Sequence, residues 1–121
     1  MSSTKELGNL AENLAARHLE EKGYEIVDKN YRKPWGEIDI IAKTGETYVF
    51  VEVKANRADF GVDFSPEVRV DWRKRQKIAK TGFFWLENEL RNTDVEWRID
   101  VVSITFDELN KKAKISHYKG I

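Results

Sequence analysis

Hydrophobic side chains return along this chain with two different periods, and these periods divide it into helices and strands. Between residues 3 and 22 they recur every three or four positions, which is typical of an amphipathic helix. Ser3 and Glu6 have the spacing of a capping box, and Gly23 is placed to end the helix after Lys22. One face of this predicted helix contains Leu7, Leu10, Ala11, Leu14, Ala15 and His18.

Strand-like segments follow this helix and return near the end of the chain. Residues 24–31, 37–43 and 48–55 are predicted strands, and the sequence "KPWG" at 33–36 separates the first two. Residues 71–90 have a helical pattern, 95–106 alternate like a half-buried strand, and 113–118 form a weak final strand. The expected order is α-β-β-β-α-β-β, an α/β or α+β fold, and residues 1–121 have the length of a single domain.

The two central strands are joined by a turn that fixes how they pair. Gly45, in "KTGET", suits the first central position of a two-residue type II′ turn, which pairs Thr44 with Thr47. Counting back from this pair gives one side of the hairpin that is wholly apolar and is expected to face the core. Its members are Ile38, Ile40, Ala42, Val49, Val51 and Val53.

The opposite side of the hairpin carries four charged residues. The same register sets Asp39 across from Glu52, with Cβ atoms roughly 4.5–5.5 Å apart, and Glu37 across from Lys54. Two carboxylates at that separation repel each other, and apolar neighbours reduce the screening by water. A shared proton, a nearby cation or a bound metal ion is therefore expected to compensate.

These residues alone leave two interpretations open. In the first, the four side chains form a solvated ion-pair face, which suits Glu37 and Lys54. In the second, Asp39 and Glu52 hold a hard divalent cation for hydrolysis, while Lys54 orients water or stabilises developing negative charge. The first interpretation leaves the repulsion between the two carboxylates unexplained.

Composition narrows the chemistry of such a site. The chain has no cysteine and only two histidines, His18 and His117, which excludes disulfides, Cys-based zinc sites and His-rich centres. Any metal would be held by oxygen, which favours magnesium, manganese or calcium. The sequence has no apolar run of membrane-spanning length and no signal-peptide core, so we expect a cytoplasmic protein with no membrane partner.

The chain has no net charge, with 21 basic and 21 acidic residues, but basic residues gather in one segment. Residues 69–80 contain one acid, Asp71, and six bases: Arg69, Arg73, Lys74, Arg75, Lys77 and Lys80. Four of these bases fall on one helical face and predict sequence-independent contacts to the phosphates of nucleic acid. Arg32, Lys33 and Arg57 would extend these contacts. A solvated helix surface is the alternative interpretation.

The same predicted helix also carries a mainly apolar line, composed of Trp72, Gln76, Ala79, Phe83, Leu86 and Leu90. We expect most aromatic residues of "FFWLENEL", at 83–90, to pack in the core, with a dimer surface as the alternative. Gln76 interrupts the line. It either points toward the charged hairpin, where it would support the metal ligands, or lies on the surface.

The order of several motifs resembles a known family. Asp39, twelve intervening residues and then Glu52-Val53-Lys54 resemble the PD-(D/E)xK nuclease motif, with Ile38 where the literal motif has proline. The whole chain resembles the YraN-like family of bacterial proteins inferred to be endonucleases, which is similar to archaeal Holliday-junction resolvases. The matching segments are "GNLAENLAARHLEEKGY", "NYR", "GEIDIIA", "VFVEVK", "FG" at 60–61, the basic helix ending in "FFWL", and "RIDVVSI".

This resemblance implies a restriction-endonuclease-like core with a central mixed sheet flanked by helices. It implies that Asp39 and Glu52 are the main ligands of Mg²⁺ or Mn²⁺, that the Val53 carbonyl assists, and that Lys54 acts on the water and the phosphate. The family also places an acidic ligand in a G-x-x-A-E context, which residues 8–12 match, so this role falls on Glu12. Glu37, in "GEID", would pair with Lys54 or support the ligands.

The expected activity is Mg²⁺-dependent cleavage of DNA, with branched or junction DNA as a candidate substrate. Resolving a junction requires two cuts, so this activity implies a homodimer. A non-catalytic nucleic-acid-binding or adaptor module on a nuclease-like scaffold is the alternative. In a third interpretation, the hairpin charges are structural and the basic helix docks a protein partner.

Overall fold

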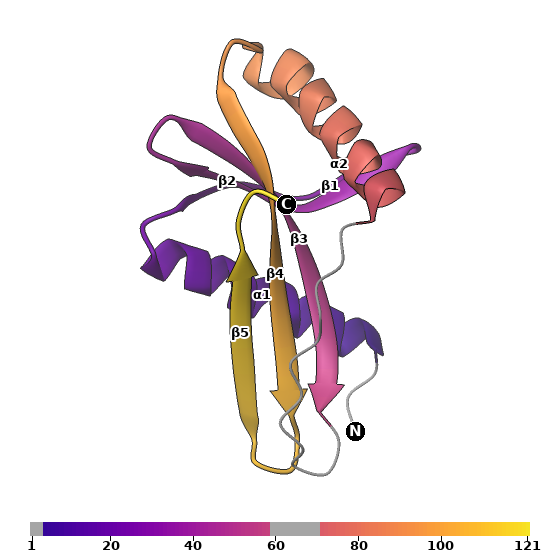
Figure 1. Cartoon of the computed structure of the whole chain (residues 1–121), viewed down its shortest axis with the longest axis vertical. Helices are drawn as coiled ribbons and strands as arrows, with labels where there is room; N and C mark the ends of the chain where they lie inside the picture. The colour runs from indigo at the N-terminus through magenta and orange to yellow at the C-terminus, as the bar shows by residue number, and fades with distance from the viewer. Residues whose placement is uncertain (1–3, 59–70) are drawn as a thin grey trace.

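The computed structural model describes residues 4–58 and 71–121, and its elements follow the predicted order (Figure 1). The expected capping residue Ser3 and basic residue Arg69 lie outside these ranges. The helices are α1 (Thr4–Glu21), α2 (Trp72–Trp85) and a π-helical turn, η1 (Leu86–Leu90). The strands are β1 (Glu25–Lys33), β2 (Gly36–Thr44), β3 (Thr47–Ala58), β4 (Glu96–Asp107) and β5 (Lys112–Tyr118). The predicted mixed α/β architecture is confirmed.

The five strands form one open sheet in the order β1-β2-β3-β4-β5. Neighbouring strands are antiparallel except β3 and β4, which pair in parallel from Thr47 and Glu96 to Ala58 and Asp107. The chain makes the parallel connection through the segment that contains α2, as parallel strands require a long crossover. Within the described ranges, no helix is long and apolar enough to cross a membrane.

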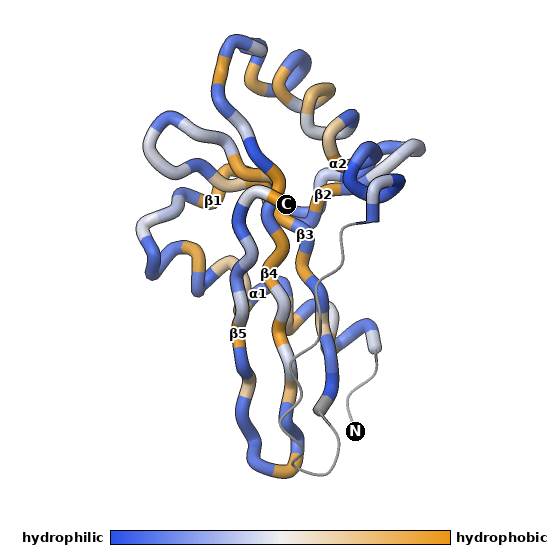
Figure 2. Tube along the Cα trace, in the orientation of Figure 1, coloured by the Kyte–Doolittle hydropathy of each residue, from blue (hydrophilic) through white to orange (hydrophobic). Residues whose placement is uncertain are grey.

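The two long helices pack on opposite faces of the sheet, and each face has its own apolar cluster. The α1 cluster includes Leu7, Ala11, Ala15, Leu19, Ile40, Val49, Val51, Val102 and Ile104. The α2 cluster includes Ile38, Ile41, Tyr48, Phe50, Ile78, Trp85, Leu86 and Ile99. Figure 2 accordingly shows the most hydrophobic stretches in the central strands and hydrophilic residues in the first turns of α2. Alternation along β3 supplies both clusters, because successive side chains point to opposite faces.

Helix α1 ends where Gly23 was predicted to end it. Gly23 has φ +92°, its N–H donates to Glu20 O at 3.0 Å, and Tyr24 N–H donates to Leu19 O at 2.9 Å. These two bonds form a Schellman motif, which satisfies the last carbonyls of the helix. The turn sends the chain directly into β1.

Helix α2 begins at an aspartate cap and is anchored by a small residue. The Asp71 carboxylate accepts hydrogen bonds from Arg73 N at 3.0 Å and Lys74 N at 3.2 Å. The buried side contains Ile78, Thr81, Gly82 and Trp85. A Cβ at Gly82 would lie 2.4 Å from the Phe50 ring, so the absence of a side chain allows α2 to pack closely on β3.

The core-facing side of α2 differs from the prediction for one aromatic residue. Trp85 is buried and Phe84 is half-buried, but Phe83 is 46% exposed and is the exception to the expectation that most of these aromatic residues pack in the core. The helix is oriented by Ile78, Gly82 and Trp85. The predicted line is therefore divided: Trp72, Gln76 and Phe83 are exposed, whereas Leu86 is buried and Ala79 and Leu90 pack against the α2 cluster. Close approach of Gly82 to the sheet decided the orientation.

Candidate active site

The predicted hairpin register is confirmed near the turn and changes at Asp39. Gly45 has φ +57°, as the first central residue of a type II′ turn requires. Strands β2 and β3 pair from Thr44 and Thr47 to Ile40 and Val51. Beyond this pair, Val53 N–H does not bond to the backbone of β2. It donates to the side chain of Asp39 instead, at 2.8 Å from Oδ2.

The neighbouring strand β1 is also irregular at this position. Asn30 lies between the residues that pair with Ile38 and Ile40, and it has the left-handed φ of 52°. The irregularity breaks the alternation of β2, so that Ile38 joins Ile41 in the α2 cluster rather than Ile40 on the other face. The prediction that Ile38 shares a face with Ile40 is therefore wrong, for this reason.

The expected pairing of Glu37 with Lys54 is also not formed. Glu37 lies opposite Arg32 of β1, and its Oε2 is 3.4 Å from Arg32 Nε. Both side chains are largely exposed, so the ion pair contributes little to stability. Glu37 is thus held by the outer strand of the sheet.

Asp39 is a partly buried carboxylate among other carboxylates. Burial raises its pKa, the hydrogen bond from Val53 N opposes this, and the charges of Glu12, Glu37 and Glu52 raise the pKa further, to about 6. The anionic form of Asp39 is therefore destabilised in the folded protein. A cation placed beside it would reverse that effect.

Glu52 lies on the α2 face of β3 and is almost fully buried, with 8% of its surface exposed. Its Oε1 forms an ion pair with Lys74 Nζ from the first turn of α2. The hydrogen bond to Glu52 raises the pKa of Lys74, aided by the charges of Glu52, Asp39 and Glu37 and opposed by burial. The start of α2, set by its aspartate cap, thus supplies the positive charge nearest to Glu52.

Lys54 lies beside Glu52 in a small pocket of about 140 Å³. The other lining residues come from α2, β4 and the last residue of the chain: Asp71, Lys74, Arg75, Ile78, Val101 and Ile121. No ion pair of Lys54 occurs among the described residues.

A second pocket, of about 420 Å³, lies on the other side of the same helix start. It is lined by Gly36, Glu37, Asp71, Arg73, Lys74, Lys77 and Ile78. We call this second pocket the basic groove, because Arg73, Lys74 and Lys77 line it. Asp71, Lys74 and Ile78 line both pockets, so the beginning of α2 lies between the basic groove and the pocket of Glu52.

Glu12 reaches the same region from the opposite face of the sheet. The side-chain nitrogen of Asn30, when it faces Glu12, lies 3.1 and 3.2 Å from the two carboxylate oxygens. Glu12 is also close enough to Asp39 to raise its pKa. Three elements, α1, β2 and β3, thus bring together the three acidic residues predicted from the sequence.

The donor set fits a hard divalent cation in its chemistry, since every candidate ligand is a carboxylate oxygen and Asp39 is destabilised as an anion. The arrangement is not a finished coordination sphere. Across residues 4–58 and 71–121, no group of three or more His, Asp or Glu side chains is close enough to hold a metal ion. Glu52 is paired with Lys74, and Glu12 lies within hydrogen-bond distance of Asn30. Both carboxylates would have to leave these partners to bind a metal ion.

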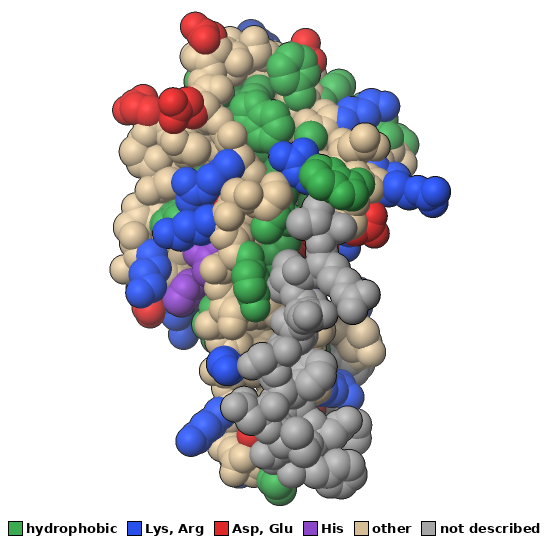
Figure 3. Space-filling model, in the orientation of Figure 1, with side chains coloured by type: hydrophobic (Ala, Val, Ile, Leu, Met, Phe, Trp, Pro, Cys, Tyr) green, Lys and Arg blue, Asp and Glu red, His purple; other side chains and the backbone are tan. Residues whose placement is uncertain are grey.

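The predicted DNA-binding residues fall into two groups. Arg73, Lys74 and Lys77 line the basic groove at the start of α2, whereas Lys33 lies 5.2 Å from the Phe84 ring near the β1–β2 turn. Arg57 lies at the far end of β3, with its Nε 3.9 Å from Glu108. Figure 3 shows basic side chains both over α2 and along the lower part of the molecule. The first group adjoins the candidate site, and Arg32 reaches its edge through the ion pair with Glu37.

Gln76 is exposed on the outer side of α2 and lines neither of the two pockets. The structure therefore does not bring it together with Asp39, Glu52 and Lys54. Lys74, two residues earlier in α2, contacts the Glu52 carboxylate instead.

The pairing of Lys74 with Glu52 is the main feature of the site that the sequence pattern did not reveal. Lys74 was one of six clustered basic residues and lay off the face shared by four of them, but periodicity did not indicate Glu52 as its partner. The available signal was Asp71, because an aspartate cap fixes the first turn and thereby the direction of Lys74.

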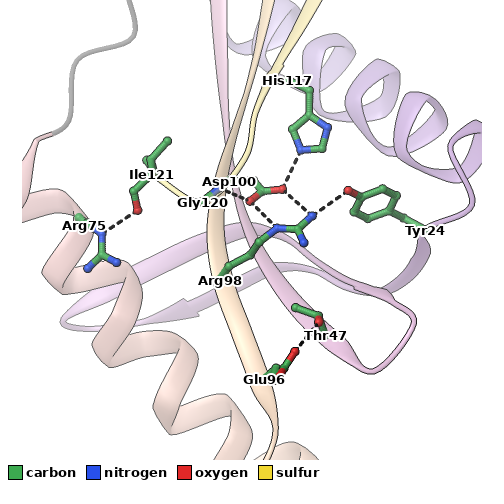
Figure 4. A network of polar contacts seen from close by, with 9 residues as sticks. All are labelled: Tyr24, Thr47, Arg75, Glu96, Arg98, Asp100, His117, Gly120 and Ile121. Atoms are coloured by element: carbon green, nitrogen blue, oxygen red, sulfur yellow. Dashed lines mark hydrogen bonds and ion pairs between the residues drawn. The ribbon is translucent and has the colours of Figure 1, made fainter.

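A second polar cluster lies on the α1 face around Asp100, for which the sequence "RIDVV" indicates a place on a sheet face or in a salt bridge (Figure 4). Asp100 is fully buried and contacts Arg98 Nε at 3.0 Å, His117 Nε2 at 2.7 Å and Gly120 N at 3.0 Å. Arg98 also donates to Tyr24 Oη at 2.8 Å. Burial opposes ionisation, but the three hydrogen bonds to Asp100 outweigh it and hold the pKa of Asp100 below its usual value. The cluster ties the chain end to the sheet and does not line the candidate site.

Comparisons with known proteins agree on one family. The profile of the uncharacterised protein family UPF0102 matches residues 11–104. A UPF0102 protein of Fervidobacterium nodosum is 40% identical over 99% of this chain and 84% of its own length. Relatives from Geobacter metallireducens (42% identical; 84% of this chain, 81% of the relative) and Thermotoga petrophila (38%; 92% of each) carry the same family name. The matched region includes Glu12, Asp39, Glu52 and Lys54, and the chain belongs to the UPF0102 (YraN-like) family.

Proposed function

We propose that this protein is a metal-dependent endonuclease that hydrolyses phosphodiester bonds in DNA, with branched or junction DNA as the substrate class. The observation that carries the proposal is the state of Asp39. This carboxylate is held by Val53 N–H and surrounded by three acidic residues that help to raise its pKa. It also occupies the first position of the motif Asp39…Glu52-Val53-Lys54, which resembles that of PD-(D/E)xK nucleases.

In this proposal, Asp39 and Glu52 hold Mg²⁺ or Mn²⁺, and Glu12 and the Val53 carbonyl assist. When bound, the ion would polarise a phosphoryl oxygen and lower the pKa of a water molecule. Asp39 is prepared for this role because its hydrogen bond to Val53 fixes the carboxylate between the separating strands.

Lys54 and Lys74 provide the positive charges in the pocket of Glu52. Lys54 would orient the attacking water and neutralise negative charge that develops on the phosphate. Lys74 is 56% exposed although its ammonium pairs with Glu52, so it stands between the buried carboxylate and the solvent. Lys74 would bind an incoming phosphate when Glu52 releases it to coordinate the metal ion.

The approach of DNA is supported by the basic groove beside the site. Arg73 and Lys77 line this groove together with Lys74, and no acidic residue occurs within α2. Contacts of this type neutralise phosphates without reading bases. They suit an enzyme that recognises DNA by shape.

The test is a cleavage assay on labelled duplex, single-stranded and four-way-junction DNA, with Mg²⁺ or Mn²⁺ and with EDTA. We expect wild-type protein to cut at least one substrate only with metal, and Asp39→Ala and Lys54→Ala to lose this activity. Glu46→Ala, which removes an exposed carboxylate from the β2–β3 turn, is the matched control and should cut normally. Absence of cleavage by wild type, or equal cleavage by all four proteins, would refute the proposal.

One observation favours a second candidate function. Glu52 is already paired with Lys74, and the described residues contain no ready group of three metal ligands. A non-catalytic nucleic-acid-binding or adaptor module would need no such group. This alternative predicts DNA binding that survives Asp39→Ala and no metal-dependent cleavage of any of the three substrates.

Junction resolution adds a requirement for the assembly. Two strands must be cut, so two active sites are needed and a homodimer is expected on the junction. A protein that remains monomeric both in solution and on a four-way junction would exclude resolution, while nicking would still be compatible with it.

A further inference from the structure

The outer side of α2 exposes aromatic rings between basic side chains. We call the line Trp72, Gln76, Ala79 and Phe83 the α2 ridge. Trp72 is 66% exposed and Phe83 is 46% exposed, although large aromatic residues are usually covered in a folded protein. The two rings are eleven residues apart, which corresponds to about 16 Å along a helix.

Cations lie beside these rings. The Arg75 guanidinium carbon is 5.8 Å from the centroid of Trp72. On the other flank, Arg73, Lys77 and Lys80 follow the ridge, and Lys80 Nζ is 5.7 Å from the centroid of Trp35, itself 36% exposed. Figure 3 shows hydrophobic and basic side chains next to each other over α2.

We propose that the α2 ridge is a stacking platform for unpaired bases of DNA, with Trp72 as its main aromatic contact. Binding of single-stranded nucleic acid combines basic residues that follow the backbone with aromatic rings on which bases stack. In a blunt duplex neighbouring pairs cover all base faces except the outer face of each terminal pair, so the basic residues would supply most of the binding. The ridge therefore selects DNA with a single-stranded segment.

The position of the ridge links it to the candidate active site. Trp72 directly follows Asp71, which lines both the pocket of Glu52 and the basic groove. A strand that stacks on Trp72 thus passes close to Glu52 and Lys54. The inference rests on the proposed function, which supplies DNA as the ligand. It adds that the protein recognises an unpaired region of that DNA.

The charge of α2 favours this occupant over a second copy of the chain. The helix has five basic residues and no acidic one. Two copies that met through their α2 ridges would bring these like charges together, which opposes association. A polyanion with exposed flat bases complements both the charge and the rings.

The experiment measures binding rather than cleavage, with the full chain in EDTA. Fluorescence anisotropy compares labelled oligothymidylate of about 20 nucleotides, longer than the usual site of roughly 4–16 nucleotides, with a blunt duplex of the same length. We expect Trp72→Ala to weaken binding of the single strand roughly 5- to 150-fold, the range for loss of one base–aromatic stack. Binding of the duplex should change little.

Two further variants separate stacking from a structural effect. Trp72→Phe keeps a flat ring and should retain most of the single-strand affinity. Leu109→Ala removes an equally exposed apolar side chain, 71% exposed, from the β4–β5 turn and should have no effect. Quenching of tryptophan fluorescence by oligothymidylate should be lost in both Trp72→Ala and Trp72→Phe, which lack the contacting indole, and retained in Leu109→Ala.

Three outcomes would overturn the inference. The first is an equal loss of single-strand and duplex binding in Trp72→Ala, or no loss of either. The second is tighter binding of oligouridylate than oligothymidylate. The third is a wild-type dimer, without DNA, that Trp72→Ala dissociates, because the ridge would then contact a second copy. None of these outcomes depends on metal-dependent cleavage, so the inference and the proposed function can fail separately.

Discussion

Two aspartates of the sheet, Asp39 on β2 and Asp100 on β4, have opposite pKa shifts because their surroundings differ. Asp39 has one backbone donor and several carboxylates nearby, and its pKa rises to about 6. Asp100 has three donors, two of them on basic side chains, and its pKa falls. Hydrogen bonding to the charged form decides the sign in the second case and is outweighed in the first. Asp39 therefore lowers stability at neutral pH, whereas Asp100 raises it.

Asp39→Asn should stabilise the protein at pH 8 and have little effect at pH 4. The pKa of Asp39 is raised from 3.8 to about 6, so the folded state binds its proton more tightly than the unfolded state. Stability is consequently lost as the pH rises from about 4 to 6. One pKa unit corresponds to about 1.4 kcal/mol, so the gain at pH 8 is on the order of 1–3 kcal/mol.

Urea denaturation of both proteins at pH 4 and pH 8 measures this difference. The asparagine oxygen can still accept from Val53 N, so the variant tests the charge and not the hydrogen bond. Glu46→Gln, in the exposed turn, controls for the loss of one acidic group. Equal stability of Asp39→Asn and wild type at pH 8 would contradict the raised pKa.

Asp100→Ala should destabilise the protein by about 3 kcal/mol or more, since removing one partner of a buried ion pair leaves the other charges uncompensated. The contribution of Asp100 is present above pH about 4 and is lost as acid protonates it, because its folded-state pKa lies below the ordinary 3.8. Thermal unfolding at pH 7 provides the measurement. Asp94→Ala, in an exposed loop, is the control and should stay within about 0.5 kcal/mol of wild type.

At the scale of elements, the position of α2 determines the candidate site. Gly82 allows the helix to approach Phe50, and Asp71 fixes its first turn, so that Lys74 meets Glu52. This close approach also leaves Trp72 and Phe83 of the α2 ridge exposed to solvent. One helix thus supplies the partner of a buried carboxylate, the wall of two pockets and an exposed surface.

Two glycine substitutions should shift stability in opposite directions. Gly82→Ala would place a Cβ 2.4 Å from the Phe50 ring and should cost about 1–3 kcal/mol through overpacking. Gly8→Ala, within α1, meets no atom within 4 Å and should add about 0.5–1 kcal/mol through helix propensity. Guanidinium denaturation of both variants measures the difference. A stabilised Gly82→Ala would mean that α2 can move away from the sheet at little cost.

The order and type of the elements were predictable because each has a local signal. Gly45 selected the turn and hence the register, and Gly23 marked the end of α1. The register changed only at Asp39, where a bond from a side chain to Val53 N replaces a backbone pair that strand periodicity assumes. Lys74 and Phe83 depend on how α2 docks on the sheet, and periodicity within a helix does not contain that information.

At the scale of the whole molecule, zero net charge hides a separation of charge. The acidic residues Glu12, Asp39 and Glu52 approach one another from α1, β2 and β3, while the bases of α2 face outward beside them. Under the proposed function, the basic side chains of α2 would attract the phosphate backbone and the acidic residues would hold the cation. Binding to DNA should therefore depend on ionic strength.

The salt dependence of duplex binding should identify which lysine and arginine side chains contact phosphates of the DNA. If Lys77 contacts one phosphate, Lys77→Ala lowers the slope of log affinity against log salt concentration by about 1. Lys119→Ala, an exposed lysine near the chain end, should leave the slope unchanged. Anisotropy titrations over a series of salt concentrations measure both. Identical slopes for Lys77→Ala and wild type would exclude Lys77 from the interface.

The parallel pairing of β3 and β4 also has a consequence for how the chain folds. The β2–β3 hairpin closes through a two-residue turn, which takes about 1–10 μs in isolated hairpins. Pairing Thr47 with Glu96 instead requires contact across 49 positions, a distant contact that slows folding. Asp39 and Val53 can therefore meet early, whereas Glu52 becomes buried only when β4 and α2 have docked. During folding, the Glu52 carboxylate would therefore remain solvated until α2 and β4 have docked.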